Sequence, residues 1–442
     1  MAGSDSSGGA GIQADLKTFA AHRVTGQSVI ASITAQNTRG VLSTFHPPSG
    51  VVADQLEALF ADGQPDAVKT GMLGNAENVQ TVARLLKRRR VRRLVVDPVI
   101  RSSGGKTLLS AAGVRTLMES LLPLATLVTP NLKEAEILSG VRIKTPKDRL
   151  KAARAILKTG VASVLIKGGH LRGRPEDFYF DGGRPLVLDG PRLTGEDVHG
   201  TGCVLAAAIA AQLALGEDPP TAVCLAKKFI GVAIRGAIRS GAGVACVEPL
   251  AGLYREEEKS GLIRRLSGAM EILKEAKIGR LVPEVQSNIG IGLEGATGHD
   301  DVLAFPGRIN RLGDDIVTFA PAAFGGSRHV ANVVLAAMRH DPAMRAVMNI
   351  RCDSELIAIC RRLKFSMASF DRAEEPVRVK VKEGSSLEWG TDTAIGRFGR
   401  VPDIVYDLGG MGKEEMIRVI APDIEMLVEK VLKIHRLYRP AG

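Results

Sequence analysis

Residues 199–215 read HGTGCVLAAAIAAQLAL, in which two glycines stand directly before a long apolar run. The run is typical of a buried helix, and glycines at its start leave the first backbone N–H groups free to bind a phosphate. Gly200, Thr201 and Gly202 are therefore a predicted anion site. Cys203 follows in the first helical turn, where the helix dipole lowers a thiol pKa, so we predict that it removes a proton from a substrate hydroxyl. A glycine-rich helix start beside a packed cysteine is the alternative interpretation of this segment.

The chain around this helix alternates β-branched runs with amphipathic stretches of helical length, up to about residue 250. The runs are 28–34, 67–70, 94–96, 126–129 and 161–166, and a probable edge hairpin follows at 178–188. Such alternation indicates an α/β fold with a mainly parallel sheet that carries helices on both faces. In these folds ligands bind beyond the carboxyl ends of the strands. The sequence places the following residues at those ends: Gln36, Met72, Asp97, Asn131 with Glu134, and Lys167.

A charged stretch at residues 251–261 interrupts this alternation and predicts a division of the chain. We expect residues 1–250 to form one domain, 251–261 to be a linker, and 262–442 to form a second, smaller α/β domain. The length of 442 residues agrees with this division, because a single hydrophobic core rarely serves so long a chain.

The charge of the chain is uneven. The formal net charge is +11, of which residues 1–250 carry +10 and residues 251–442 carry +1. Much of the excess lies between Lys87 and Arg93, in a run that closes a predicted helix and has no interleaved aromatic residues. We therefore do not expect a nucleic acid partner, and a basic first half suits phosphorylated substrates.

The apolar runs fall short of the roughly 20 residues that span a bilayer, and the first residues show no leader pattern. The five cysteines form no CxxC pair, which argues against a disulfide framework and against a structural zinc site. These features predict a cytoplasmic protein that does not associate with membranes.

Six motifs occur in the order found in hydroxymethylpyrimidine kinases of the ribokinase-like superfamily. They are GSDSSGGAGIQAD (3–15), TAQNT (34–38), GML (71–73), DPV (97–99), TPNLKE (129–134) and KGGH (167–170). Residues 1 to about 248 resemble that family, which implies a ribokinase-like fold and phosphorylation by ATP with Mg²⁺. Pyridoxal kinases of the same superfamily are the alternative, and Gln36 with Met72 favours the pyrimidine.

The resemblance also implies roles by position. Gly3, Asp15, Gln36 and Met72 would hold the pyrimidine, Asn131, Glu134 and Asp97 would organise Mg²⁺, Lys167 would hold nucleotide phosphate, and Cys203 would be the catalytic base beside Gly200, Thr201 and Gly202. The amide of Gln36 can offer both a donor and an acceptor to an aminopyrimidine edge.

One departure from this family concerns the strand before the glycine-rich segment. The family has about eight mostly apolar residues there, whereas this chain begins Met1-Ala2-Gly3. Loss of a central strand would expose a sheet edge. We therefore expect the first strand to be missing from these residues and an upstream start to supply it.

The second half contains clusters of small and basic residues and no nucleotide loop. FGGSRH (324–329) opens a predicted helix at which backbone donors converge with Arg328 and His329, a combination suited to a diphosphate. Further clusters are KEGSSLEWG (382–390), PDIVYD (402–407) and GGMGKE (409–414). Each cluster alone is compatible with an ordinary surface.

Together these clusters resemble the archaeal-type thiamine-phosphate synthase domain over residues 262–438. The motifs that match are SNIG (287–290), FPGRI (305–309), SRH (327–329), MRHDP (338–342), MNIR (348–351) and EGSS (383–386). The resemblance implies that hydroxymethylpyrimidine diphosphate condenses with a thiazole phosphate and releases pyrophosphate. We expect Arg328 and His329 to hold the leaving group, assisted by Lys413 and Mg²⁺. Asn288, Ser386 and Asp403 are predicted contacts to the product or the thiazole.

Two positions depart from this second family. Cys352 stands where an aromatic residue is expected, and Leu408 where an arginine is expected, which removes a phosphate contact. Similar domains behind helix-turn-helix modules resemble thiamine-phosphate sensors, so a kinase with a sensing domain is the alternative function. The kinase partner favours catalysis. The expected partners are the small-molecule substrates, together with further copies of the chain in a homo-oligomer.

Overall fold

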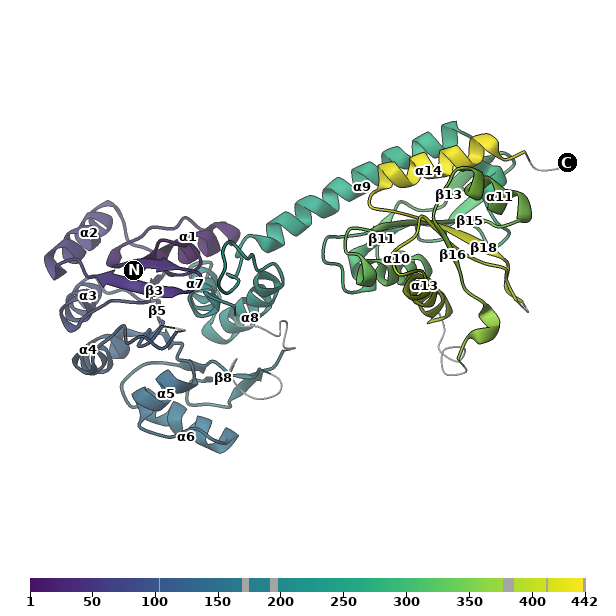
Figure 1. Cartoon of the computed structure of the whole chain (residues 1–442). Helices are drawn as coiled ribbons and strands as arrows, with labels where there is room; N and C mark the ends of the chain where they lie inside the picture. The colour runs from purple at the N-terminus through teal and green to yellow at the C-terminus, as the bar shows by residue number, and fades with distance from the viewer. Residues whose placement is uncertain (103, 169–174, 191–197, 377–384, 411, 440–442) are drawn as a thin grey trace. The chain divides into compact units, whose positions relative to one another are not determined.

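The computed structural model describes residues 1–102, 104–168, 175–190, 198–376, 385–410 and 412–439. The chain divides into two compact units, Met1–Tyr254 and Arg255–Gly442. Each unit combines a sheet with packed helices (Figure 1), as the alternating pattern predicts. Within the described residues no helix combines the length and the hydropathy of a membrane span.

The first unit is built around short, buried parallel strands. Its strands are β1 (Ala2–Asp5), β2 (Ile30–Asn37), β3 (Gly40–Phe45), β4 (Val68–Thr70), β5 (Leu94–Val96), β6 (Leu127–Val128), β7 (Val164–Ile166), β8 (Asp177–Phe180) and β9 (Leu186–Leu188). One sheet has the order β4-β5-β6-β7-β8-β9 and another the order β1-β2-β3. Strands β4 to β7 pair in parallel, whereas β8 and β9 form the antiparallel edge hairpin that the sequence predicts.

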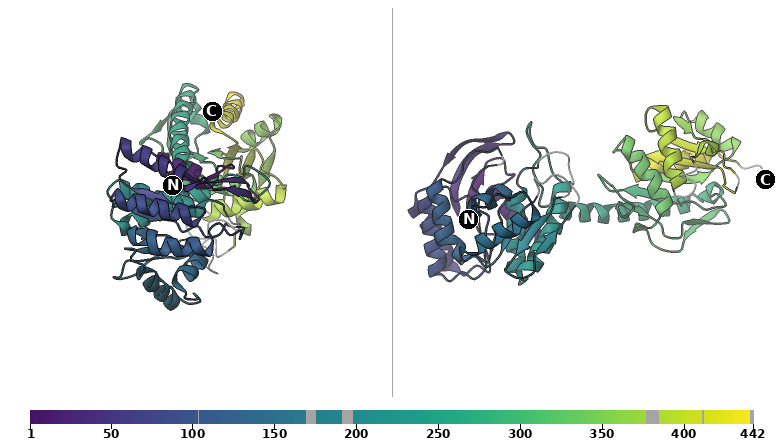
Figure 2. Two further views of the ribbon diagram at one scale, coloured as in Figure 1. Left: turned by 90° about the vertical axis from the view of Figure 1, so that its left-hand side faces the viewer. Right: turned by 90° about the horizontal axis from the view of Figure 1, so that it is seen from below.

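Helices cover both faces of this unit, as Figure 2 shows. They are α1 (Gly11–Ala21), α2 (Ser49–Asp62), α3 (Ala76–Arg88), α4 (Ala111–Thr116), α5 (Leu132–Ser139), α6 (Pro146–Leu157), α7 (Thr201–Ala214) and α8 (Pro219–Arg235). One hydrophobic core packs α1, α7 and α8 against the sheet. A second hydrophobic core packs the helices from α2 through α6 against it. Helix α7 is apolar on every side because the sheet and α8 enclose it.

The first strand, which we expected to be missing, is present in short form. Residues Ala2–Asp5 pair in parallel with β2. The same segment joins β4, because the Met1 amino group donates to the carbonyl of Lys69 at 2.8 Å and Gly71 N–H donates to the carbonyl of Met1 at 2.9 Å. A short strand is enough here, because β2 on one side and the segment of β4 on the other offer backbone groups for its hydrogen bonds.

The charged stretch at 251–261, predicted as a linker, is helical. Helix α9 runs without a break over Ala251–Glu275. Arg255 pairs with Asp301, and Glu258 pairs with Arg345 at 2.7 Å, so charges that suggested a solvated linker hold α9 against the second unit. Charge alone did not reveal these partners, which lie far away in the sequence.

The second unit has a seven-stranded sheet in the order β14-β11-β10-β15-β18-β17-β16 and a separate hairpin, β12-β13. Its strands are β10 (Ile289–Gly292), β11 (Val302–Ala304), β12 (Ile309–Leu312), β13 (Asp315–Thr318), β14 (Ala323–Phe324), β15 (Ala346–Arg351), β16 (Met367–Ser369), β17 (Ile404–Asp407) and β18 (Met416–Ala421). Its other helices are α10 (Arg328–His340), α11 (Ser354–Arg362), α13 (Ser385–Phe398) and α14 (Ile424–Leu437). Helix α10 packs against the sheet in one hydrophobic core. Helices α9, α11 and α14 pack against the sheet in a second core.

Candidate functional site

The start of α7 forms the centre of the candidate site in the first unit. Gly200 caps the helix with φ at 88°, and a Cβ at this position would lie 1.9 Å from the carbonyl oxygen of Gly9. Only glycine fits here, so the glycine-rich loop lies directly against the helix start. A Cβ at Gly202 would lie 3.2 Å from the ammonium of Lys167, which places that cation beside the free N–H groups of α7. The predicted anion site and the predicted phosphate lysine are therefore neighbours.

Lys167 and Asp97 form a largely buried ion pair in this site. Nζ of Lys167 lies 3.0 Å from Oδ1 of Asp97, which Thr129 also contacts at 3.3 Å. Burial opposes the charge on Lys167, but the carboxylates of Asp97 and Glu134 outweigh this effect and raise its pKa. The lysine is therefore fully charged at neutral pH, as binding of a phosphate requires.

Asn131 and Glu134, the predicted magnesium residues, form a capping box at the start of α5. The Asn131 side chain accepts from Glu134 N–H at 3.0 Å, and Glu134 accepts from Asn131 N–H at 2.8 Å. Burial, and then the charge of Asp97, raise the pKa of Glu134 to about 7. No cluster of three or more metal-ligating residues occurs in the described part of the chain. Magnesium at nucleotide phosphates needs only one or two carboxylates, so Asp97 and Glu134 fit such an ion.

The prediction of a depressed thiol pKa at Cys203 is wrong. Burial raises the pKa of this thiol to about 11, and the carboxylates of Asp97 and Asp15 add to the shift. The charge of Lys69 and a hydrogen bond from Gly11 N–H act in the opposite direction and do not compensate. The direction of this shift is set by burial and by carboxylates from distant segments, which the sequence does not reveal.

We expect the reactivity of Cys203 to follow this raised pKa. The thiolate is the form that alkylates, so its labelling by iodoacetamide should rise about ten-fold per pH unit from pH 7 to 10. Peptide mass spectrometry of the full-length chain would give this rate for each cysteine separately. A rate for Cys203 that levels off above pH 8 would contradict the raised pKa and restore the dipole argument.

Asp15, predicted to bind the pyrimidine, is held by a residue that sequence reasoning missed. Both of its oxygens lie 2.8 Å from Nζ of Lys69, and both side chains are almost fully buried. Lys69 also lies close enough to Cys203 to affect its pKa. Asp15 therefore holds Lys69 in place, and its contact with the pyrimidine stays a prediction. A lysine inside the apolar strand β4 was the one signal of this pair in the sequence.

Removal of one partner of this ion pair should destabilise the first unit. Lys69→Met leaves the Asp15 carboxylate buried without its counter-charge, which costs about 3–5 kcal/mol of unfolding free energy. Lys69→Met combined with Asp15→Asn should recover much of that loss. Urea unfolding of the full-length variants, followed through the transition of the first unit, measures both. A loss in the double variant equal to the sum of the losses in Lys69→Met and Asp15→Asn would show that the pair is not coupled.

Of the remaining residues predicted to hold the pyrimidine, Gln36 and Met72 lie at or just beyond the carboxyl ends of β2 and β4, and Gly3 lies within β1. A Cβ at Gly3 would lie 3.2 Å from the sulfur of Met72, so these two residues are in contact. Gln36 is half-buried, and its Nε2 lies 2.8 Å from Nε2 of His199. Gly3 is thus beside Met72, and Gln36 is beside His199, a residue of the first motif to which the sequence assigned no role.

In the second unit, strand register gathers several side chains at one edge of the sheet. Arg351, at the end of β15, pairs with Met416, at the start of β18, and Met416 pairs with Asp407, at the end of β17. Asn288 immediately precedes β10 and also lies at this edge, since Ile289 pairs with Met348. This edge is the candidate synthase site.

Asn288 positions a loop at this edge. Its Nδ2 donates to the carbonyl of Phe305 at 2.9 Å, and its Oδ1 accepts from Phe305 N–H at 3.1 Å. The side chain is buried, and its Oδ1 also accepts from Ile289 N–H at 2.9 Å, so its direct contact with product stays a prediction. A Cβ at Gly326 would lie 2.5 Å from the carbonyl oxygen of Ala304, which packs the loop before α10 against the same edge.

Arg328 and His329 occupy the first positions of α10, as predicted. Both side chains are exposed, and within the described residues neither makes a hydrogen bond or an ion pair. The guanidinium of Arg328, the imidazole of His329 and the free N–H groups of the helix start are thus available to an anion.

Lys413 and Ser386 are brought together, whereas Asp403 lies elsewhere. Nζ of Lys413 lies 3.3 Å from the Ser386 hydroxyl and 3.4 Å from the carboxylate of Glu375, whose buried Oε1 has no partner among the described residues. Asp403 precedes β17 at the opposite edge, where it binds Lys430 at 2.6 Å and Ser366. Its predicted contact with substrate is therefore wrong, because the acid at the site edge is Asp407, four residues later.

Asp407 organises two arginines that sequence reasoning missed. It is fully buried, binds Nε of Arg372 at 2.5 Å, and binds Nη2 of Arg418 at 2.9 Å. Two guanidinium groups share one carboxylate, so the cluster keeps a positive charge next to Lys413. Arg418 lies within an apolar strand and Arg372 outside any recognised motif, and neither position suggested a site in the sequence.

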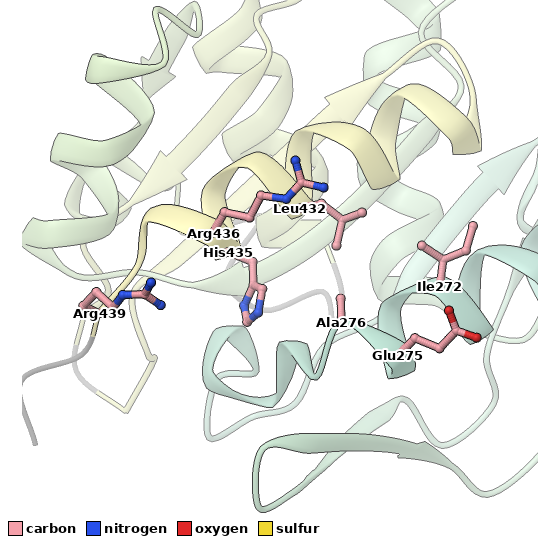
Figure 3. Close-up of a pocket in the computed structure, with 7 residues that line it drawn as sticks. All are labelled: Ile272, Glu275, Ala276, Leu432, His435, Arg436 and Arg439. Carbon is pink, nitrogen blue, oxygen red and sulfur yellow. The ribbon is translucent and has the colours of Figure 1, made fainter.

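A separate hollow of the second unit lies at the ends of α9 and α14, and Figure 3 shows its lining. It has a volume of about 530 Å³ and is lined by Ile272, Glu275, Ala276, Leu432, His435, Arg436 and Arg439. None of the predicted site residues lines it. A hollow of the first unit, of about 340 Å³, reaches Asp15 and Lys69 and the second half of α7, and its lining does not include the start of that helix.

Comparison with known proteins identifies both halves. The phosphomethylpyrimidine kinase family matches residues 5–248, and the thiamine-phosphate synthase ThiN family matches residues 265–433. The bifunctional thiamine biosynthesis protein ThiDN of Methanocaldococcus jannaschii is 34% identical over 443 residues, which cover 99% of this chain and 98% of that protein. The chain belongs to this bifunctional family. The kinase half and the synthase half predicted from the sequence are confirmed at the family level.

Two further similarities agree with this membership. The thiamine biosynthesis bifunctional protein ThiED of Geobacter sulfurreducens is 47% identical over 244 residues, which are 55% of this chain and 50% of that protein. The chain thus spans about half the length of this relative. The ADP complex of Bacillus subtilis pyridoxal kinase is 35% identical, with a TM-score of 0.53, and covers 56% of this chain and 95% of that chain. The ribokinase-like fold of the first unit is thereby confirmed.

Proposed function

We propose that the first unit phosphorylates hydroxymethylpyrimidine, and then its phosphate, with ATP. The observation that carries this proposal is the start of α7, where the N–H groups around Gly202 lie beside the Lys167–Asp97 pair and the thiol of Cys203. Transfer of a γ-phosphoryl group depends mainly on positioning and on stabilisation of negative charge. The helix start and Lys167 supply that stabilisation, and Gln36, Gly3 and Met72 hold the pyrimidine so that its hydroxymethyl group faces Cys203.

Asp97 and Glu134 would hold Mg²⁺, which neutralises phosphate charge when it is bound with the nucleotide. The residues of the chain itself provide the remaining functions. Lys167 fixes the phosphate, while Cys203 accepts the hydroxyl proton once its own proton has left. Since burial disfavours the thiolate, the proposal implies that kinase turnover rises with pH through the neutral range.

The test of this half is a count of phosphoryl transfers. The full-length protein, supplied with ATP, Mg²⁺ and hydroxymethylpyrimidine, should release two molecules of ADP per molecule of pyrimidine. One molecule of ADP would restrict the unit to the first step. Preferred turnover of pyridoxal would replace the pyrimidine by the alternative substrate.

We propose that the second unit condenses the resulting diphosphate with thiazole phosphate to thiamine phosphate. Bond cleavage releases pyrophosphate, whose charge must be held locally because residues 251–442 carry a net charge of only +1. At a helix start Arg328 offers a guanidinium and His329 an imidazole, neither of them paired within the described residues, and Lys413 adds a cation beside Ser386. A cytoplasmic location and a homo-oligomer remain predictions from the sequence.

A further inference from the structure

His199 and Gln36 form a direct side-chain contact across the candidate kinase site. Nε2 of the Gln36 amide lies 2.8 Å from Nε2 of the imidazole, although the two residues are 163 positions apart in the chain. Gln36 lies at the end of β2 and His199 directly before α7. The contact therefore links the strand that carries the pyrimidine-binding amide to the helix that carries the anion site.

The imidazole of His199 is held in a fixed place. The backbone N–H of His199 donates to the carbonyl of Ala245 at 2.8 Å, and the carbonyl of His199 accepts from Val247 N–H at 3.0 Å. A Cβ at Gly9 would lie 3.3 Å from the ring, so the glycine-rich loop packs against one side of it. Oδ2 of Asp5 lies 3.7 Å from Nε2 of the ring, the same nitrogen that Gln36 contacts at 2.8 Å.

Asp5 in turn belongs to the glycine-rich loop and holds it in shape. Its carboxylate accepts from Ala10 N–H at 2.8 Å and from Ser7 N–H at 2.9 Å. The side chain is buried. The glycine-rich loop, Asp5 and the imidazole of His199 thus pack together, and Gln36 is hydrogen-bonded to Nε2 of that imidazole.

This contact fixes the amide of Gln36. The amide nitrogen can only donate, so in this contact Nε2 of His199 is the acceptor. The hydroxyl of Thr34 lies 3.4 Å from Oε1 of Gln36, but its single hydrogen is better placed on the carbonyl of Ser4 at 2.9 Å. The oxygen of the amide and one remaining N–H are therefore left for a ligand.

We propose that His199 is a positioning residue that fixes the orientation of the Gln36 amide and thereby selects a pyrimidine with an amino group. The inference rests on the proposed function, in which Gln36 binds the pyrimidine. An aminopyrimidine edge offers an N–H donor beside a ring nitrogen acceptor, which matches the free oxygen and N–H of the fixed amide. The 4-oxo analogue presents the reversed pattern and would require the amide to flip. Without His199, the amide can flip at little cost.

Replacement of His199 should therefore change selectivity. His199→Phe keeps a ring but removes the acceptor. In the full-length protein, the preference in kcat/KM for the aminopyrimidine over its 4-oxo analogue should fall at least ten-fold, while KM for ATP stays near its original value. His199→Gln restores an acceptor oxygen and should recover part of the preference. If His199→Phe does not fold, His199→Leu serves in its place.

A double-substitution cycle separates this role from a general structural one. If His199 acts through the amide, adding His199→Phe to Gln36→Ala should cause no further loss of kcat/KM for the aminopyrimidine. His22→Phe is the matched control, because this ring packs against Phe229 in the same unit and makes no contact with Gln36. This control should retain the original preference.

The outcomes separate the inference from the function on which it rests. A wild-type protein that phosphorylates neither pyrimidine defeats the proposed function. An active wild-type protein whose preference survives in His199→Phe defeats only the inference. Additive losses in the cycle would do the same, since they would show that His199 does not act through Gln36.

Discussion

Replacement of Cys203 by alanine is expected to lower kinase turnover about 10²-fold, with little change in the binding of ATP. Loss of a general base usually costs about 10²–10⁴-fold. The lower end applies because a thiol with a pKa of about 11 is ionised in only about one molecule in 10⁴ at pH 7. A thiolate of higher pKa is also a stronger base, and this offsets about half of the loss from its low abundance on a logarithmic scale.

The pH profile provides a second readout of the same variant. Wild-type turnover should rise with pH, because the deprotonated form of Cys203 becomes more abundant, while the remaining turnover of Cys203→Ala should be flat. Cys224→Ala, which changes a cysteine of α8 that is remote from the start of α7, should behave as wild type. Near-normal turnover in Cys203→Ala would return this cysteine to a packing role.

Arg328→Ala and His329→Ala should each depress formation of thiamine phosphate about 30- to 1,000-fold and leave kinase turnover unchanged. Each variant removes a cationic contact that strengthens as the pyrophosphate departs, worth about 2–4 kcal/mol of transition-state stabilisation. The measurement is thiamine phosphate formed by the full-length protein from supplied hydroxymethylpyrimidine diphosphate and thiazole phosphate.

The same helix offers a matched control for this pair. Arg339 and His340 end α10 and are paired with Glu388 and Asp392, both at 2.9 Å, so they are committed elsewhere. Arg339→Ala with His340→Ala should retain condensation. Product formation that survives in both N-terminal variants would leave the function intact and move the pyrophosphate site, with Lys413 and Arg372 as the next candidates.

The sequence predicts most of the fold because local patterns determine most of its elements. The β-branched runs become β2 and β4 to β7. The glycines at 200 and 202 lie at a helix start, where the lack of a side chain leaves the backbone accessible. Residues at strand ends were predictable for the same reason. Parallel strands place their carboxyl ends at one edge of a sheet whatever their partners are.

Features that depend on long-range contacts were not predictable in this way. The pKa of Cys203 is set by burial among carboxylates from distant segments, and the hydrogen bond of Gln36 to His199 joins residues 163 positions apart. Asp403 and Asp407 bracket the same short strand, and only its register shows which of them lies at the site edge. Charge in residues 251–261 suggested a linker because the ion-pair partners of Arg255 and Glu258 lie more than 40 positions away.

The most direct test of the whole account is a single reaction with both halves present. The full-length protein is incubated with hydroxymethylpyrimidine, thiazole phosphate, ATP and Mg²⁺, and both ADP and thiamine phosphate are measured. We expect thiamine phosphate to accumulate together with two molecules of ADP for each molecule formed. ADP without thiamine phosphate, from a protein that binds thiamine phosphate tightly, would contradict the synthase and make the second unit a sensor. Neither product would contradict both assignments.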